Sequence, residues 1–246
     1  MRACARAERR SRPWHGALAT WLAALAVAVT SAAWAQESAF PNQGFENGLT
    51  HWSSTSVTVV GTQTVNVSCG STGALTWTVA PYATGTQMAR LYPAGAITGT
   101  SNAWDQLGLS SASRTYLANI FPNSTDYAIL YRDLTLQAGD SFTMAWNYVA
   151  TDYAPFNDGS FVSLVNRTDP GAQLPLINGL VGDLQVLGVT VNNGTGTYVT
   201  GDCGSTGWQT TTLEVRASGT YRLGFAAFNL TDTVLSPVVF VDEAAG

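Results

Sequence analysis

The amino-acid sequence predicts an all-β protein, a two-sheet antiparallel β-sandwich, and three observations lead to this prediction. After residue 36, apolar residues almost never recur at the spacing of a helix. Short runs rich in Val, Thr, Tyr, Phe and Trp recur instead, separated by Gly, Asn, Asp and Pro. About 210 residues follow the first 35, which suits one sandwich, because such domains commonly reach about 200–250 residues.

The predicted strands follow one another along the whole of this region. Residues Phe142, Met144 and Trp146 fall on one face of their strand, as expected for a strand that is half buried. The predicted strands span Val57–Val60, Thr64–Ser68, Ala74–Val79, Gln87–Leu91, Ala128–Leu136, Ser141–Ala150, Ser160–Asn166, Leu184–Val191, Thr210–Val215, Gly219–Asn229 and Val238–Asp242.

The connecting segments contain recognisable turns and two longer irregular stretches. Gln137–Asp140 is predicted to join its flanking strands as a hairpin loop with glycine at the strained position, and Ala217–Gly219 to do the same. The stretch Pro93–Asn123 is expected to be a long loop or a short helix on the edge of the sandwich. The stretch Thr195–Gly207 is expected to be a polar, glycine-rich loop.

The first 35 residues have the three parts of a secretory signal peptide. Five arginines precede the apolar run Ala17–Val29, and small residues flank Trp34 at a suitable cleavage site. Thirteen residues are too few to span a bilayer easily, since spanning takes roughly 20; the alternative is an uncleaved anchor helix. We therefore expect a signal peptide over residues 1–35, a single domain over 36–246, a secreted or cell-surface location, and no transmembrane anchor in the mature chain.

The charge balance indicates which partners to exclude. Beyond residue 35 the chain has six arginines, no lysine and 15 acidic residues, a net charge of −9. Binding to nucleic acid requires clustered cations on the protein. Nucleic acid is therefore not an expected partner.

Two cysteines, Cys69 and Cys203, remain beyond the signal peptide, and each opens the same pentapeptide, CGSTG. An even number of cysteines in an exported chain predicts a disulfide between them. The alternative is a metal pair, but the sequence places no histidine near either one.

Three segments, Asn42–Trp52, Ala138–Leu164 and Thr206–Glu243, together carry a family resemblance. The first is NQGFENGLTHW, which is similar to the opening of galactose-binding-like jelly-roll domains, including several families of carbohydrate-binding modules. The combination resembles exported bacterial proteins that carry one such domain before a C-terminal PEP-CTERM sorting signal. The resemblance implies affinity for a polysaccharide or the extracellular matrix. The resembled proteins usually continue beyond this point with an anchor that is absent here, so either the chain is released or the sequence is truncated, and both interpretations stay open.

The resemblance also implies a structural calcium ion between the first and last strands. Within the opening motif, Phe45 is expected to anchor the first strand into the core and Trp52 to cap the sandwich, while the carboxylate of Glu46 lies between a core aromatic and the turn at Gly48. Glu46 and Asp242 are the expected ligands, because calcium binds six to eight oxygen atoms from carboxylates and carbonyls. The alternative is that Glu46 caps a turn and Asp242 is solvated at a strand end.

A loop in the middle segment combines acid, amide and aromatic residues of the kind that bind sugars. The same residues are also suited to building a turn, because Asn and Asp bond to their own backbone. The sequence leaves both interpretations open. The expected ligand-binding residues are Asp152, Tyr153, Asn157, Asp158 and the aromatic Trp104, and a row of exposed aromatics among Trp77, Tyr82, Tyr92, Trp104 and Tyr116 would favour glycan binding.

The sequence offers little for catalysis. His51 is the only histidine beyond the signal peptide, so a zinc site or a Ser-His-Asp triad would have to be built around it. We expect a non-catalytic binding or surface module. The alternatives are a purely structural matrix or surface protein without a small ligand and, third, a secreted glycoside hydrolase with two facing carboxylates.

Overall fold

The computed structural model describes residues 40–244 except 70–72, 83–84, 193 and 200. The chain divides into two units, residues 1–37 and residues 38–246. The predicted signal peptide lies outside the described residues, all of which belong to the second unit. Within the described part, no helix is both long enough and apolar enough to cross a membrane.

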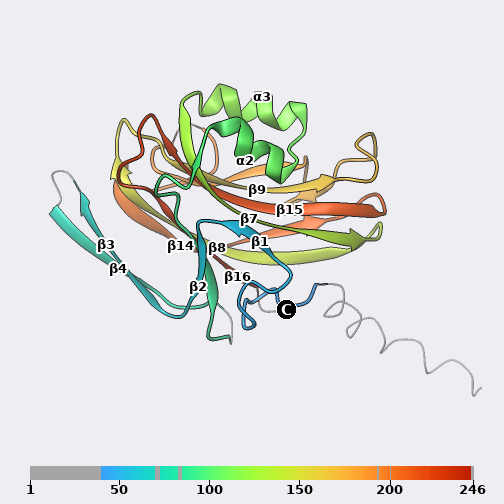
Figure 1. Ribbon diagram of the computed structural model, residues 1–246, viewed down its shortest axis with the longest axis horizontal. Coiled ribbons are helices and arrows are strands. Elements are labelled where there is room, and N and C mark those ends of the chain that lie inside the picture. The colour runs from blue at the N-terminus through green and yellow to red at the C-terminus, as the bar shows by residue number, and fades with distance from the viewer. Residues whose placement is uncertain (1–39, 70–72, 83–84, 193, 200, 245–246) are drawn as a thin grey trace, which may run out of the picture. The chain divides into compact units, whose positions relative to one another are not determined.

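Two seven-stranded sheets face each other, which confirms the predicted all-β sandwich (Figure 1). The first, which we call the helix-side sheet, has the order β1-β7-β15-β9-β12-β13, with β6 paired to β7. Its strands are β1 (Ser53–Thr55), β6 (Ile97–Thr98), β7 (Ser124–Leu136), β9 (Gly159–Asn166), β12 (Leu184–Val189), β13 (Thr197–Tyr198) and β15 (Gly219–Leu230). All of these pairs are antiparallel except β12 with β13.

The second sheet, the hairpin-side sheet, has the order β11-β10-β14-β8-β16-β5-β2 and is antiparallel throughout. Its strands are β2 (Val57–Val60), β5 (Met88–Leu91), β8 (Ser141–Tyr153), β10 (Leu176–Ile177), β11 (Leu180–Val181), β14 (Asp202–Glu214) and β16 (Val238–Glu243). A separate hairpin of β3 (Gln63–Cys69) and β4 (Gly73–Val79) extends beside this sheet (Figure 1).

The long strands alternate between the two sheets, and this corrects the two predicted hairpins. Strand β7 is in the helix-side sheet and β8 is in the other, so Gln137–Asp140 connects the two sheets instead of closing a hairpin. The connection from β14 to β15 does the same. Gly139 does adopt a positive φ of 96°, and its N–H donates to the Val215 carbonyl at 2.7 Å. Residue alternation could not distinguish these cases, because strands on either side of one core have the same pattern.

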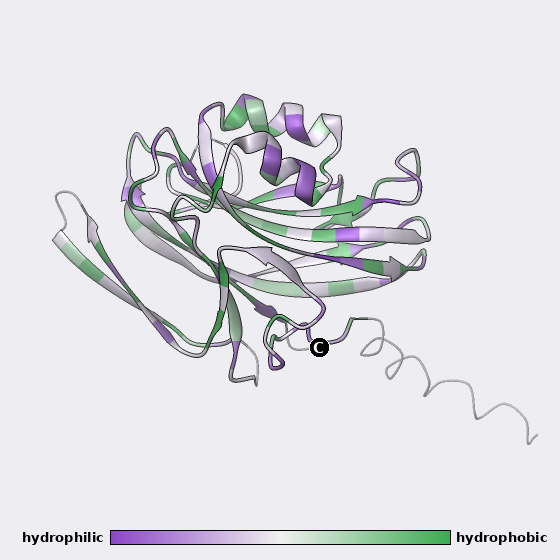
Figure 2. Cartoon of the chain, in the orientation of Figure 1, coloured by the Kyte–Doolittle hydropathy of each residue, from purple (hydrophilic) through white to green (hydrophobic). Residues whose placement is uncertain are grey.

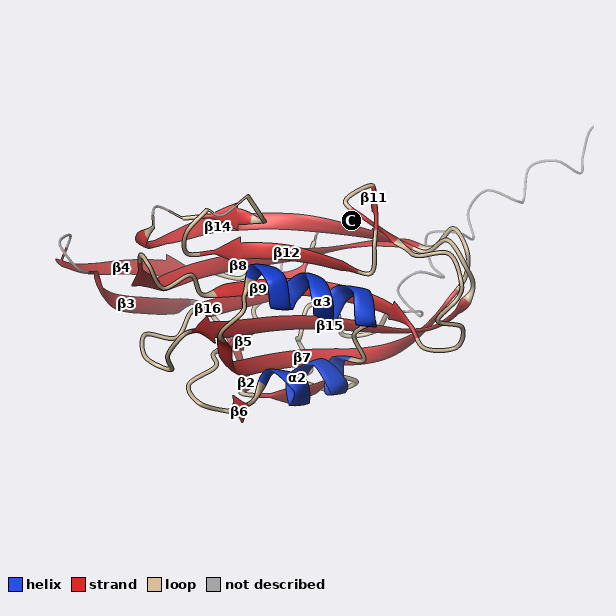
Figure 3. Ribbon diagram, turned by 90° about the horizontal axis from the view of Figure 1, so that it is seen from above, coloured by secondary structure: helices blue, strands red, loops and turns tan. Residues whose placement is uncertain are grey.

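The stretch Pro93–Asn123 contains two helices that cover a face of the sandwich, so the prediction of a loop or short helix at its edge is wrong. Helices α2 (Thr100–Leu107) and α3 (Ser111–Ile120) lie over the helix-side sheet (Figure 3). The Ser110 hydroxyl accepts a hydrogen bond from the Ser113 N–H at 3.2 Å and so caps α3. Only a few apolar residues of each helix are buried, which explains why the sequence pattern was weak.

The predicted loop Thr195–Gly207 is also partly wrong, because it contains β13 and the first residues of β14. The pairing of β14 with β8 shifts register between Asp202 and Gly204 and again between Ser205 and Trp208. Such irregularities interrupt the alternation from which strands are predicted. The glycines of this segment therefore mark bulges in a strand.

Three apolar clusters hold these layers together. The largest fills the space between the two sheets and includes Met144, Tyr148 and Phe225. The second lies between the helices and the helix-side sheet, and the third lies between the β3–β4 hairpin and the hairpin-side sheet. Hydrophobic and hydrophilic residues mix along the long strands (Figure 2), because each sheet presents two different faces.

Candidate functional site

The opening motif packs its aromatic residues into the core, as predicted. Phe45 is fully buried, and its ring centroid lies 5.2 Å from that of Trp52. The Trp52 indole donates to the Asn42 carbonyl at 3.1 Å. Phe45 lies in a turn with a φ of 61°, so the motif is a structured turn before the first strand.

The two expected metal ligands, Glu46 and Asp242, hold the same short segment of chain. Glu46 Oε1 accepts the N–H groups of Thr86 at 2.7 Å and Gln87 at 2.9 Å. Asp242 Oδ2 accepts the N–H of Tyr82 at 2.7 Å. Desolvation raises the pKa of Glu46, but the hydrogen bonds from Gln87 and Thr86 outweigh it and hold the pKa below its usual value. The two carboxylates thus hold Tyr82 on one side and Thr86 and Gln87 on the other.

The carboxylates of Glu46 and Asp242 meet only some of the requirements of a calcium site. Carboxylate oxygens are ligands that calcium prefers, but both oxygens of Glu46 already accept hydrogen bonds, Oε1 from two N–H groups and Oε2 from the Thr86 hydroxyl at 2.8 Å. In the described portion, acidic, histidine and cysteine side chains do not gather in threes as a metal site. Calcium at Glu46 and Asp242 therefore stays a prediction.

A surface pocket lined by tryptophans lies beside the segment that these carboxylates hold. The pocket has a volume of about 530 Å³ and is formed between the β3–β4 hairpin and strands β8 and β14. We call it the aromatic pocket; its lining residues are Trp77, Thr78, Val79, Ala80, Pro81, Asn147, Ser205, Gly207 and Trp208.

The aromatic side chains of this pocket are held in place by specific contacts. The Trp208 indole N–H donates to the Ala80 carbonyl at 3.0 Å. The ring of Tyr82, which is 41% exposed, lies 5.5 Å from the Trp208 ring and is tilted by 56°. The Ser205 hydroxyl donates to Asn147 Oδ1 at 2.8 Å. Aromatic surfaces and polar groups thus meet in one open depression.

A second pocket of about 550 Å³ lies where the α2–α3 connection meets the loop after β9. Arg167 lines it and lies close to Gly108, where a side chain's Cβ would be only 2.0 Å from Arg167 Nη1. Gly108 therefore makes room for the guanidinium. Aromatic side chains are absent from the described residues that line this pocket, so it is the weaker candidate for a sugar site.

Most of the predicted ligand-binding residues in the middle loop are inside the protein. Asp152, Asn157 and Asp158 are buried, whereas Tyr153 is 38% exposed. The Asn157 side chain accepts the Val191 N–H at 2.7 Å, and Asp152 accepts the N–H of Tyr153 at 2.8 Å. These hydrogen bonds to backbone N–H groups are of the kind expected if the loop residues shape the chain and do not bind a ligand. A ligand-binding role for the loop stays a prediction.

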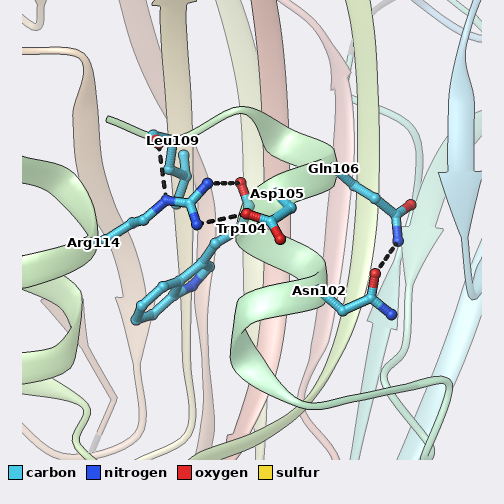
Figure 4. A network of polar contacts seen from close by, with 6 residues as sticks. All are labelled: Asn102, Trp104, Asp105, Gln106, Leu109 and Arg114. Carbon is cyan, nitrogen blue, oxygen red and sulfur yellow. Dashed lines mark hydrogen bonds and ion pairs between the residues drawn. The ribbon is translucent and has the colours of Figure 1, made fainter. Parts of the chain in front are cut away.

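Trp104, also predicted to bind ligand, is nearly buried in α2. Figure 4 shows Arg114 of α3 beside it, donating to Asp105 at 2.6 Å and to the carbonyls of Leu109 and Trp104. Gln106 donates to Asn102 one turn away at 3.1 Å. These bonds fasten the two helices together over the second apolar cluster. Trp104 is therefore a packing residue in this arrangement, and of the five aromatics considered for an exposed row only Tyr82 and Tyr116 are exposed.

Polar side chains gather between the two sheets at the end where β8 finishes and β9 begins. Asp126, Asp152, Asp158 and Asn229 are each at most 2% exposed. Each continues the face of its strand that carries the main core residues, such as Ala128, Ala150 and Ala227. We call these four side chains the buried acid layer.

The electrostatics of this layer are unfavourable to ionised carboxylates. Burial, together with the nearby charges of Asp152, Asp232 and Asp126, raises the pKa of Asp158 to about 8, although a hydrogen bond from the Leu230 N–H opposes the shift. Burial likewise raises the pKa of Asp152 to about 6. The ion pairs found in the described part of the chain, Arg114–Asp105 and Arg222–Asp133, lie elsewhere.

The predicted disulfide is not settled by this structure. Cys203 is buried in the third apolar cluster together with Val65 and Val67 of β3, the strand that ends at Cys69. The side chain of Cys69 lies outside the described residues. The Cys69–Cys203 bond therefore stays a prediction.

Comparison with known proteins gives only distant likenesses. No family model and no curated protein matches the sequence. Among solved structures, the carbohydrate-binding module TmCBM61 in complex with β-1,4-galactotriose has 12% identity and a TM-score of 0.38, over 83% of this chain and 94% of that one. The K1 cleaved adhesin domain of Lys-gingipain from Porphyromonas gingivalis W83 has 12% identity and a TM-score of 0.35, over 82% and 96%. An enzymatically active domain of a bacteriophage CBA120 tailspike has 5% identity and a TM-score of 0.35, over 84% and 21%. Likenesses this distant do not identify a ligand, so the functional argument rests on the geometry above.

Sequence reasoning named Trp77 and Tyr82 as aromatics to check, but it missed Trp208 and therefore the aromatic pocket. Trp208 follows the second CGSTG repeat directly, one residue after the segment Thr195–Gly207 that was interpreted as a loop. Its meeting with Trp77 depends on the pairing of β14 with β8 and on the position of the hairpin. An aromatic residue that directly follows a glycine-rich bulge was the available clue.

Proposed function

We propose that this protein is an exported, non-catalytic carbohydrate-binding module that binds a polysaccharide in the aromatic pocket. The observation that carries the proposal is the meeting of Trp77, Trp208 and Tyr82 around one open depression with polar groups in it. Sugar rings present C–H faces that pack on aromatic rings, and their hydroxyls need hydrogen-bond partners. The pocket supplies both.

The composition of the pocket supports binding without hydrolysis. Glycoside hydrolysis generally uses two carboxylates that flank the bond to be cleaved. The described residues that line the aromatic pocket include no aspartate, glutamate or histidine. The same lining contains Asn147, Ser205 and Thr78, whose neutral groups suit hydrogen bonds to sugar hydroxyls.

The segment that carries Tyr82 links the pocket to the expected calcium site. Asp242 and Glu46 bond to residues Tyr82, Thr86 and Gln87. A calcium ion on these carboxylates would therefore act at a distance from the sugar, by ordering the segment that presents the Tyr82 ring. Calcium at this position and export through residues 1–35 are parts of the proposal.

A glycan-array screen of the purified protein, with and without calcium, tests this function. We expect binding to one or more polysaccharides and a loss of about tenfold or more in affinity for Trp208→Ala, since buried contacts of tryptophan often contribute about 2 kcal/mol or more. The matched control is Tyr116→Ala, which removes an exposed aromatic from α3 and should leave binding unchanged.

Two results would contradict the proposal. If the parent protein binds no glycan under either condition, the alternative of a structural matrix or surface protein is favoured. If a glycan is bound equally well by Trp208→Ala and by Trp77→Ala, the binding site lies elsewhere on the domain.

A further inference from the structure

Two buried oxygen atoms of the buried acid layer come from residues that lie opposite each other. Asp158 Oδ2 and Asn229 Oδ1 are both inaccessible to solvent, and among the described residues neither has a hydrogen-bond partner. Phe228 of β15 pairs with Gly159 of β9, so Asn229 and Asp158, one step further along, lie opposite each other. Both side chains point into the space between the two sheets, because they continue the alternation of the core residues.

The contacts of the Asn229 amide determine which of its two ends lacks a partner. The amide nitrogen donates to Asp126 Oδ1 at 2.9 Å and to Ser236 Oγ at 2.8 Å. A reversed amide would place its oxygen against the Asp126 carboxylate, where two acceptors repel each other. Asn229 Oδ1 is therefore the end of the amide that needs a donor.

The surroundings of Asp158 supply one backbone donor and several acids. The Leu230 N–H donates to Asp158 Oδ1 at 2.8 Å, which leaves Oδ2 without a donor. Cations are absent from the described groups whose charge acts on this carboxyl. The titratable groups that face it from the neighbouring elements are Asp126 of β7, Asp152 and Tyr148 of β8, and Asp232 of the segment after β15.

A proton on Asp158 Oδ2 satisfies both unpartnered oxygens at once. A buried acceptor without a donor loses the free energy of a hydrogen bond, and a protonated carboxyl group becomes a donor. Its hydroxyl can donate to Asn229 Oδ1 while the other oxygen still accepts the Leu230 N–H. Burial raises the pKa of Asp158 to about 8, which agrees with a carboxyl group that keeps its proton at neutral pH.

We propose that the carboxyl group of Asp158 is protonated and donates a hydrogen bond to Asn229 Oδ1, and that loss of this proton to the solvent releases residues 231–237. When Asp158 ionises, both of its oxygens are acceptors. Only the nitrogen end of the Asn229 amide can then bond to Oδ2. The amide therefore turns, and its bonds to Asp126 and Ser236 are lost.

Residues 231–237, which connect β15 to β16, are held to the layer by polar contacts. The Asn229 amide bonds to Ser236, and the Thr151 hydroxyl donates to the carbonyls of Leu235 and Ser236. Val234 is 62% exposed, so little apolar burial opposes an opening of this segment. A turn of the Asn229 amide removes one of the anchors of Ser236, which links the proton on Asp158 to the position of the segment.

Infrared spectroscopy of the full chain tests the proton. Ordinary carboxylates are ionised at pH 7, so we expect a carbonyl stretching band of a protonated carboxyl group that disappears at pH 10 and is lost in Asp158→Asn. The matched control is Asp105→Asn, which removes a carboxylate from an exposed ion pair and should keep the band. Absence of the band from the parent protein at pH 7, or its persistence in Asp158→Asn, would overturn the proposal.

Cleavage within residues 231–237 by subtilisin tests the release. The rate is divided by that of an unfolded peptide of the same sequence at each pH, which removes the pH dependence of the protease. We expect the corrected rate to rise by about tenfold or more between pH 7 and pH 9.5 in the parent protein. Asp158→Asn should show no such rise, because its amide can donate to Asn229 Oδ1 at either pH. A constant rate in the parent, or an equal rise in Asp158→Asn, would contradict the release.

A second variant keeps the test decisive if Asp158→Asn does not fold. Ser236→Ala removes the hydroxyl that the Asn229 amide bonds to and leaves Asp158 in place. We expect it to keep the infrared band at pH 7 but to be cleaved faster than the parent at that pH. Ser218→Ala is its control, because the Ser218 hydroxyl accepts the Ala138 N–H instead. Loss of the band in Ser236→Ala, or cleavage as slow as in the parent, would show that the proton and the segment are not linked through Asn229.

Discussion

Strand β8 contributes to two regions of opposite character. On its outer face, Asn147 lines the aromatic pocket, an open depression in which the polar groups are paired or reach the surface. On its inner face, Asp152 belongs to the buried acid layer, where charges repel and two oxygens have no partner. The outer region is suited to a large neutral ligand, whereas the inner one favours protonated carboxyl groups.

The difference shows that polar residues near one end of a sandwich need not form a single binding site. Alternation along a strand sends neighbouring residues to opposite faces, so Asn147 and Asp152 meet different partners. Burial raises the pKa values of Asp152 and Asp158, so the buried acid layer disfavours ionised carboxylates. The following predictions test this division, from the largest expected effect to the smallest.

The pH dependence of stability is the broadest test of the buried acid layer. Because the pKa of Asp158 is raised to about 8 and that of Asp152 to about 6, the native state keeps protons that the unfolded state releases from about pH 4 upward. The free energy of unfolding in EGTA should therefore fall by about 2–4 kcal/mol between pH 5 and pH 9. Urea unfolding at a series of pH values measures this fall. A stability that rises over this range would contradict the buried charges.

Asp158→Asn should stabilise the calcium-free protein. The substitution keeps an acceptor for the Leu230 N–H and removes a buried charge, so we expect a gain of about 1–3 kcal/mol at pH 8 in EGTA. Asp105→Asn is the matched control, because Asp105 forms an exposed ion pair with Arg114 and should change stability by less than about 1 kcal/mol. A loss of stability in Asp158→Asn would indicate that the carboxylate has a favourable partner within the fold.

Tyr82→Ala tests the aromatic pocket at its margin. The ring is partly exposed and packs on Trp208, so its removal should weaken polysaccharide binding by about threefold to tenfold, less than the loss for Trp208→Ala. Affinity for the polysaccharide found on the array is the measurement. Tyr198→Ala removes another exposed tyrosine and should have no effect. An effect as large as that of Trp208→Ala would place Tyr82 at the centre of the site.

Glu46→Gln should have the smallest effect on stability. The side chain is exposed, and an amide oxygen can still accept the N–H groups of Thr86 and Gln87. We expect the melting temperature to fall by about 1–2 °C in calcium, from the lost charge at the expected ion site. The same fall in EGTA would show that Glu46 holds the segment without calcium.

Much of the fold was predictable because the long strands carry a clear alternation. Strand β15, with Tyr221, Leu223 and Phe225 on its inner face, is an example. The helices were not predictable to the same degree, since α2 buries little more than Ala103, Trp104 and Leu107. Assignment of strands to sheets also escaped prediction, because a turn such as Gln137–Asp140 suits both a hairpin and a connection between sheets.

The candidate sites were predictable only in their residue types. The acids of the middle loop were recognised as unusual, but their burial depends on strands β7 and β15, which bring Asp126 and Asn229 beside Asp158. Similarly, the meeting of Trp77 and Trp208 joins residues about 130 positions apart. Long-range pairing of this kind leaves no mark in the local sequence.

The most direct test of the division between the two regions is the glycan-array signal of Trp208→Ala against that of Asp158→Asn, both measured in calcium. We predict that Trp208→Ala loses the signal and Asp158→Asn keeps it. Loss of the signal in Asp158→Asn with retention in Trp208→Ala would contradict the account and place the sugar at the carboxylates.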